Sequence, residues 1–175
     1  LGYALAMSQE PILVLTTGGT IDKAYFDALS EYQIVDSDIP ALLKEARVAL
    51  PFRVVELMRK DSLELSEEDR ALIAATAREA PERRIVVTHG TDTMTETAKV
   101  LAAEVPGKTI CLTGALTPAR FAETDAPFNL GMAFAAVQTA PPGVWIAMSG
   151  QVFDALKVRK DRAAGKFVAA EQGKA

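Results

Sequence analysis

Short runs of apolar residues alternate along the chain with longer segments in which apolar residues recur at helical spacing. The short runs are rich in β-branched residues and lack strict apolar and polar alternation, so each is expected to form a strand that is buried on both faces. Five such strands are predicted, at residues 11–17, 52–58, 83–90, 108–114 and 143–150. Each runs into polar or glycine-containing residues, which are typical of a turn.

The intervening segments predict four helices, at residues 37–46, 66–80, 91–104 and 128–140. Ser66 and Asp69 have the spacing of a capping box at the start of the second helix. Alternating strands and helices indicate an α/β fold: a single domain with a mostly parallel, doubly wound sheet of the flavodoxin or Rossmann type and helices on both faces. Ligands of such sheets bind beyond the carboxyl ends of the strands. We therefore expect the site in the loops where strands end.

Three stretches depart from this rhythm. Residues 21–36 are long for a connection between a strand and a helix, and are expected to form a lid or a disordered segment that carries Tyr25 and Tyr32. The tail from about residue 155 is basic and then alanine-rich, and is expected to end as a short helix or a frayed terminus. Residues 1–6 precede Met7 without the basic region of a signal peptide, so we interpret them as a leader and residues 7–175 as the single domain.

Composition narrows the classes of partner and site. The chain has 175 residues, 49% of them hydrophobic, and a formal net charge of −4, so we expect a small-molecule ligand and no nucleic acid or membrane partner. The only cysteine, Cys111, excludes an internal disulfide and a cysteine-based metal cluster, and fits a reducing, cytoplasmic compartment. His89 is the only histidine and is expected to be structural. No metal and no cofactor are predicted.

The first strand ends in hydroxyl groups and glycines. Thr16 and Thr17 finish the strand, Gly18 and Gly19 allow the backbone to turn closely around a ligand, and Thr20 follows. The stretch lacks the lysine of a phosphate-binding loop and the third glycine of the dinucleotide fingerprint. It is therefore either a candidate position for a nucleophile or a tight turn flanked by β-forming residues.

A second strand ends in the sequence THGTDTMTET, at residues 88–97. Thr91 and Asp92 are expected to face the same crevice as Thr17, where Asp92 can receive an ammonium group or orient a lysine. The alternative is simple capping of the next helix, because Thr91, Asp92 and Thr93 are all good N-cap residues. A threonine nucleophile also needs a group that removes its proton. The candidates are Lys160, Tyr25 and Tyr32.

These segments together resemble the L-asparaginase family. TTGGTID and THGTDTMTET are similar to its two signature segments in order and separation. KDSLELSEED is similar to its substrate segment, TGALTP to one of its turns and DAPFNL to the start of one of its helices. The resemblance covers residues 12–161. It is strongest to short, single-domain bacterial L-asparaginases, because the usual member continues into a C-terminal domain that this sequence does not contain.

The resemblance implies an amidohydrolase that converts L-asparagine and water to L-aspartate and ammonia through an aspartyl-enzyme intermediate. It implies that Thr17 is the primary nucleophile and that Thr91, Asp92 and Lys160 form a relay in which the lysine acts as base. Which threonine attacks first is left open. Substrate is expected to contact Asp61 and Ser62 at its α-carboxylate and Asp92 at its α-ammonium, with Gly90, Thr91 and Ala115 close by. The resemblance also implies a homodimer or homotetramer.

Several points stay open at this level. Either Tyr25 or Tyr32 matches the catalytic lid tyrosine, and either tyrosine alternatively only packs over the strand ends. Longer relatives complete the site with a glutamate and an asparagine from a neighbouring C-terminal domain, a contribution for which Glu64 or the tail after Lys160 is the local candidate. We expect weak or no glutaminase activity. Two alternatives are an amidotransferase-type subunit that generates ammonia for aminoacyl-tRNA, and a non-catalytic sensor domain that binds an amino acid.

Overall fold

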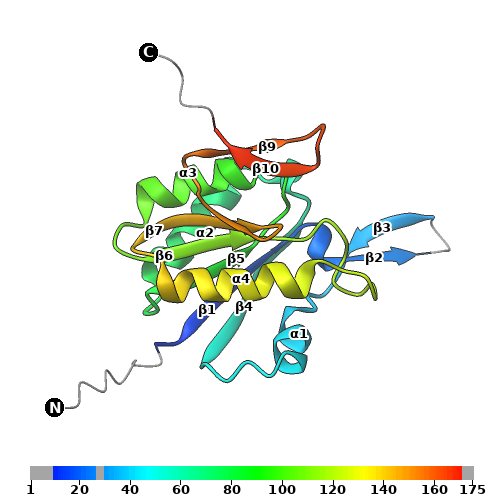
Figure 1. Cartoon of the computed structure of the whole chain (residues 1–175), viewed down its shortest axis with the longest axis horizontal. Coiled ribbons are helices and arrows are strands. Elements are labelled where there is room, and N and C mark those ends of the chain that lie inside the picture. Colours follow the sequence, from blue (N-terminus) through cyan, green and yellow to red (C-terminus); the bar gives the residue numbers. More distant parts are fainter. Residues whose placement is uncertain (1–9, 27–29, 171–175) are drawn as a thin grey trace.

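A six-stranded sheet forms the centre of the molecule in the computed structural model, which describes residues 10–26 and 30–170 (Figure 1). The strand order is β4-β1-β5-β6-β7-β8, and the strands are β1 (Ile12–Gly18), β4 (Phe52–Lys60), β5 (Arg84–Thr88), β6 (Thr109–Thr113), β7 (Gly143–Met148) and β8 (Gln151–Asp154). The first five are parallel, and β8 pairs antiparallel with β7. The predicted α/β class with a mostly parallel sheet is confirmed.

Four helices cover the two faces of this sheet: α1 (Ile39–Glu45), α2 (Glu67–Glu79), α3 (Met94–Glu104) and α4 (Ala126–Thr139). Alternate residues of β1 serve different faces, as strand geometry requires. Leu13 and Leu15 belong to the apolar core that includes residues of α2 and α3, whereas Ile12 and Val14 belong to the core that includes residues of α1 and α4. Each side chain of this size contributes about 1.5–3 kcal/mol when fully buried. The doubly wound arrangement follows from burial on both faces.

The long connection after β1 is a hairpin in its described part. A short 3₁₀ turn, η1 (Thr20–Asp22), leads into β2 (Lys23–Phe26), which pairs antiparallel with β3 (Glu31–Ile34). The hairpin projects from the side of the molecule at the right of Figure 1. The expectation of a disordered segment was wrong for these residues, because two β-forming runs pair with Tyr25 directly opposite Tyr32. A role as a lid stays a prediction.

The C-terminal part also forms strands. Strand β9 (Val158–Asp161) pairs antiparallel with β10 (Lys166–Ala169), and this hairpin lies beside α3 at the top of Figure 1. These residues form strands where a short helix was expected, and Val158 and Phe167 are buried in the core. The alternative of a frayed terminus stays a prediction. The leader assigned to residues 1–6 and the last five residues of the tail lie outside the described residues. Across residues 10–26 and 30–170, no helix has both the length and the apolar character required to span a bilayer.

Candidate functional site

Three loops that follow neighbouring strands meet at one edge of the sheet. Gly19, after β1, lies so close to the loop after β5 that a Cβ atom on it would be 2.5 Å from the backbone nitrogen of Gly90. A Cβ atom on Gly90 would in turn be 2.6 Å from the hydroxyl oxygen of Ser62, in the loop after β4. Gly19 also has a φ of +86°, which favours glycine. The predicted convergence of the strand-end loops therefore depends on glycines that allow backbone contact.

Thr17 is buried at the end of β1. Its side-chain hydroxyl donates a hydrogen bond of 2.8 Å to the backbone oxygen of Thr88 at the end of the adjacent strand β5. Its neighbour Thr16 is also buried, but the Thr16 hydroxyl has no hydrogen-bond partner within the described part of the chain. The two threonines therefore differ in environment, with the Thr17 hydroxyl held in one orientation.

Thr91, Asp92 and Lys160 form one hydrogen-bonded group. Lys160 lies on β9, and its Nζ donates to Thr91 Oγ1 at 2.7 Å and to Asp92 Oδ1 at 2.6 Å. The Lys160 side chain is 15% exposed and that of Asp92 is 36% exposed, so the ion pair is partly shielded from water. Charge-assisted hydrogen bonds of this length fix both partners of the lysine. The structure thus brings together three residues that were predicted to act as a relay.

Ser62 begins the short 3₁₀ turn η2 (Ser62–Glu64) after β4. Its hydroxyl is buried and, in the described residues, has no hydrogen-bond partner, which is costly for a polar group unless a ligand or water supplies one. The backbone oxygen of Ser62 accepts a hydrogen bond of 2.7 Å from the Thr93 hydroxyl. Thr93 occupies the N-cap position of α3 without making a side-chain capping bond. Its side chain instead ties the loops after β4 and β5 together.

Asp61 caps η2 and forms an ion pair that the sequence analysis did not find. Its carboxylate accepts from the backbone nitrogen of Leu63 at 3.2 Å and from Lys23 Nζ at 2.8 Å. The hydrogen bond from Lys23 is the main reason that the pKa of Asp61 lies below its usual value. The exposed Glu64 accepts from the backbone nitrogen of Asp61 at 3.4 Å. The sequence does not predict this ion pair, because Lys23 lies on β2 and Asp61 in the loop after β4.

The two candidate lid tyrosines pack against each other on the first hairpin. The ring centroids of Tyr25 and Tyr32 are 5.1 Å apart, and Tyr32 lies 6.2 Å from the ring of Phe121. Both tyrosines are about half exposed. Tyr32 lines a hollow together with Thr20 and Lys23. Which of the two tyrosines is the lid residue stays a prediction.

Ala115 closes the same edge of the sheet. It is buried just after β6, next to Gly114, whose backbone oxygen accepts a hydrogen bond of 3.0 Å from Asn129. A Cβ atom on Gly114 would lie 2.4 Å from the backbone oxygen of His89. The backbone beyond β6 therefore contacts the backbone beyond β5, and a substrate contact of Ala115 stays a prediction.

Two buried titratable groups lie behind the site. Both ring nitrogens of His89 have hydrogen-bond partners at 2.7 Å, the backbone oxygen of Gly90 and the hydroxyl of Thr97, and burial lowers the pKa of His89 to about 4. This agrees with the structural role expected for it. Asp22 is buried where η1 meets the hairpin and accepts a hydrogen bond of 2.9 Å from the Ser37 hydroxyl. Burial raises the pKa of Asp22 to about 6.

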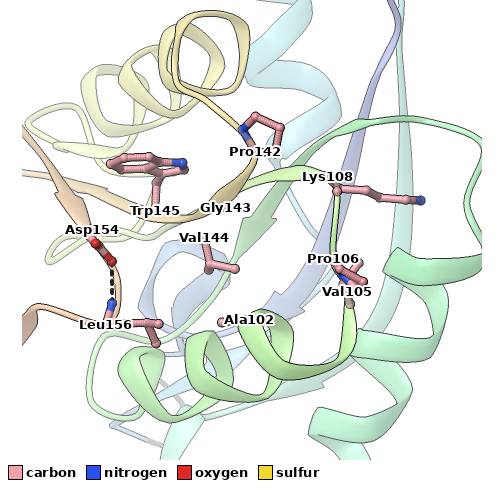
Figure 2. Close-up of a pocket in the computed structure, with 11 residues that line it drawn as sticks. Ala102, Val105, Pro106, Lys108, Pro142, Gly143, Val144, Trp145, Asp154 and Leu156 are labelled. Atoms are coloured by element: carbon pink, nitrogen blue, oxygen red, sulfur yellow. Dashed lines mark hydrogen bonds between the residues drawn. The ribbon is translucent and has the colours of Figure 1, made fainter.

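A hollow of about 380 Å³ lies at the opposite end of the sheet, where β6 and β7 begin (Figure 2). Trp145, Asp154 and Leu156 line it, and none of the predicted site residues does. Figure 2 shows the side chain of Lys108 pointing away from this hollow, and its Nζ donates to the backbone oxygen of Ala77 at 2.6 Å. Over the described ranges, no group of three or more histidine, cysteine, aspartate or glutamate side chains is arranged to hold a metal ion.

Comparison with known proteins agrees with the geometry. The family model "Asparaginase, N-terminal" matches residues 11–171. The chain is 31% identical over 163 residues to the L-asparaginase of Thermococcus kodakarensis, covering 88% of this chain and 48% of that protein. It is 30% identical over 172 residues to a probable periplasmic L-asparaginase of Haemophilus influenzae, covering 91% of this chain and 49% of that protein.

Solved structures give the same relationship. The thermostable L-asparaginase from T. kodakarensis superposes with a TM-score of 0.79 at 28% identity, over 91% of this chain and 51% of that one. A probable cytoplasmic L-asparaginase from Campylobacter jejuni superposes with a TM-score of 0.75 at 29% identity, over 86% and 49% of the two chains. The chain spans about half the length of these relatives. Because the family match extends from the first strand of the central sheet through the last hairpin, the chain belongs to the asparaginase family.

Proposed function

We propose that the chain hydrolyses L-asparagine to L-aspartate and ammonia, with Thr17 as nucleophile. The observation that carries this proposal is the pair of hydrogen bonds from Lys160 to Thr91 and Asp92 at the edge of the sheet where Thr17 lies. A partly shielded lysine in contact with a hydroxyl can exchange a proton with it, which is the function that a hydroxyl nucleophile requires nearby.

The proposed reaction has two steps. The Thr17 oxygen attacks the side-chain amide carbon of asparagine, the hydroxyl proton passes to the departing nitrogen through the relay, and ammonia leaves an aspartyl ester on Thr17. Water activated by the same relay then attacks the ester, which releases aspartate and returns the proton to Thr17. Backbone N–H groups near Thr91 are proposed to stabilise the oxyanion that forms in each step.

Substrate recognition is proposed to use the charges of the zwitterion. Asp92 binds the α-ammonium group, while the buried and otherwise unpartnered hydroxyl of Ser62 donates to the α-carboxylate. Holding both groups presents the amide to Thr17 at a reduced entropic cost. Gly90 and Ala115 are proposed to contact the substrate between these two groups. We propose weak or no activity on glutamine. Either Tyr25 or Tyr32 is proposed to act as the catalytic lid tyrosine, with packing over the strand ends as the alternative role.

The chain is further proposed to act in the cytoplasm as a homodimer or homotetramer. Its single thiol, Cys111, is buried, and burial raises its pKa to about 12. A chain with one cysteine forms no internal disulfide, so its folding does not require an oxidising compartment. Light scattering at assay concentration is expected to give a mass of two or four chains. A monomeric mass in an active preparation would contradict the assembly proposal and leave the activity proposal standing.

The test of the activity is ammonia release by the purified chain from L-asparagine and from L-glutamine, each with and without aspartyl-tRNA. Release from asparagine, with glutamine at least about tenfold slower, is the expected result. Ammonia transfer that depends on aspartyl-tRNA would favour the amidotransferase alternative. Calorimetric binding of asparagine without turnover would favour the amino-acid sensor, and either outcome would reject the hydrolase.

A further inference from the structure

Lys23 lies beside the candidate site without a role in the proposed reaction. It begins β2, and its Nζ donates to Asp61 Oδ2 at 2.8 Å. The Lys23 side chain is 24% exposed, so its ammonium group is partly shielded but still open to a ligand. Lys23 and Tyr32 together line two adjacent hollows, one of about 360 Å³ that also includes Thr20 and one of about 580 Å³ that also includes Asp61. The lysine therefore lies beside the loops that follow β1 and β4.

The partner of Lys23 is the direct neighbour of Ser62. Ser62 can donate only one hydrogen bond, because it carries a single hydroxyl proton. A carboxylate ligand brings two oxygens and a full negative charge, and such a ligand is bound more strongly when a cation is among its donors. Lys160 already donates to Thr91 and Asp92. Lys23 is instead bound to Asp61, the residue that directly precedes the buried serine in the chain.

We propose that Lys23 recognises the α-carboxylate of the substrate together with Ser62, and that it makes the site selective for amides that carry this carboxylate. The inference rests on the proposed function. Asp61 positions the ammonium group before substrate binds, and the substrate carboxylate then shares it. The site thus has two lysine and aspartate pairs, with Lys160 and Asp92 beside Thr91 and the α-ammonium group, and Lys23 and Asp61 at the α-carboxylate.

The contact also ties the hairpin to the loop that carries Ser62, so a purely mechanical role must be separated from charge recognition. A mechanical tie affects all substrates alike. Charge recognition affects only those with an α-carboxylate. The informative comparison uses L-asparagine and 3-aminopropanamide, which is the same amide with hydrogen in place of the α-carboxylate.

Removal of Lys23 alone would leave Asp61 free to repel the substrate carboxylate. The test therefore compares Asp61→Asn with the double variant Lys23→Met and Asp61→Asn, which differ only at Lys23. From the first to the second, kcat/KM for L-asparagine is expected to fall by about tenfold or more, mainly through KM. The value for 3-aminopropanamide, or its inhibition constant against asparagine where turnover is too slow, is expected to change less than about twofold.

Two single variants complete this comparison. Lys23→Arg is expected to retain most of the asparagine selectivity because it keeps the positive charge. Lys44→Met, which removes an exposed lysine of α1, is expected to behave as the parent. Equal losses for both amides on removal of Lys23, or no loss with L-asparagine, would overturn the proposal.

A binding measurement separates this inference from the proposed function. If the parent released no ammonia from any amide, the hydrolase proposal would fail, and calorimetry with L-aspartate would still test Lys23. An affinity for L-aspartate about tenfold lower in the double variant than in Asp61→Asn would support the inference. Equal affinities, or no binding by the parent, would overturn it.

Discussion

Lys160 Nζ lies 2.7 Å from Thr91 Oγ1, although the two residues are 69 positions apart in the sequence. The contact exists because β9 and β10 pair as a hairpin and bring Lys160 to the loop after β5. A C-terminal hairpin that packs against α3 thus delivers a positive charge to the edge of the parallel sheet. This contact links the last described elements of the chain to the proposed chemistry.

Replacement of Lys160 by methionine is expected to lower kcat for asparagine by about 10²- to 10⁴-fold, because the substitution removes the proton-transfer group and keeps much of the side-chain volume. Initial rates of ammonia release give the measurement. Lys166→Met is the matched control, since Lys166 is exposed on the other strand of the same hairpin. A Lys160→Met enzyme within about threefold of the parent would exclude the lysine from the relay.

Gly90→Ala is expected to displace Ser62, because the new Cβ atom would lie 2.6 Å from the serine oxygen and 2.7 Å from its Cβ. The expected result is a KM for asparagine raised by about tenfold or more. The loss in free energy of unfolding is expected to be smaller than the loss in free energy of substrate binding. Gly131→Ala provides the control, since nothing lies within 4 Å of a Cβ at that helical position. If Gly90→Ala bound asparagine as the parent does, Ser62 would not be a substrate contact.

Much of this arrangement was predictable from residue patterns. The five parallel strands follow from short apolar runs, although the edge strand β4 is only partly buried, so the expected burial on both faces was wrong for that strand. Parallel strands bring their carboxyl ends to one edge, which predicted that the loops with Thr17 and Thr91 would meet. The capping box of Ser66 and Asp69 is a local pattern and is present. Local patterning and strand direction were sufficient for these features.

Features that depend on pairing between distant segments were not predictable in this way. The two hairpins lie in stretches whose residues favour several structures, and their strands form because partners are available in the folded chain. The ion pair of Lys23 with Asp61 joins the first hairpin to the loop after β4. The sequence alone does not indicate which of several lysines an aspartate contacts in the folded chain. Thr93 has the residue type and position of an N-cap, but its side chain bonds to the loop after β4 instead.

Asp22→Asn is expected to stabilise the protein near neutral pH. The pKa of Asp22 is about 6 in the folded protein, above the ordinary aspartate value of 3.8, so the folded state binds this proton more tightly. Its contribution to stability is therefore lost as pH rises from about 4 to about 6, by about 3 kcal/mol. Urea unfolding at pH 4 and pH 7.5 should show Asp22→Asn gaining on the parent by about this amount between the two conditions.

The matched control for that experiment is Glu45→Gln, an exposed carboxylate of α1. Its free energy of unfolding relative to the parent should change little between the two pH values. An Asp22→Asn variant whose difference from the parent is the same at pH 4 and pH 7.5 would refute the burial of an acid with a raised pKa at this position.

His89 is expected to act in the opposite direction over the same range. Its folded pKa of about 4 lies below the ordinary histidine value of 6.5, so its protonation favours the unfolded chain. Stability is lost as pH falls from 6.5 towards 4, by about 3 kcal/mol. In His89→Gln this loss should disappear, and only the Asp22 effect remains. The free energy of unfolding of the variant, relative to that of the parent, is therefore expected to be higher at pH 4 than at pH 7.5. Parallel pH profiles of parent and variant would contradict this.

The most direct test of the central claim compares isosteric changes at two adjacent threonines of β1. Thr17→Val removes the proposed nucleophile, whereas Thr16→Val removes a buried hydroxyl that has no hydrogen-bond partner in the described residues. Ammonia release from asparagine is expected to fall by about 10³-fold or more in Thr17→Val and to stay within about threefold of the parent in Thr16→Val. Full activity in a folded Thr17→Val protein would contradict the account.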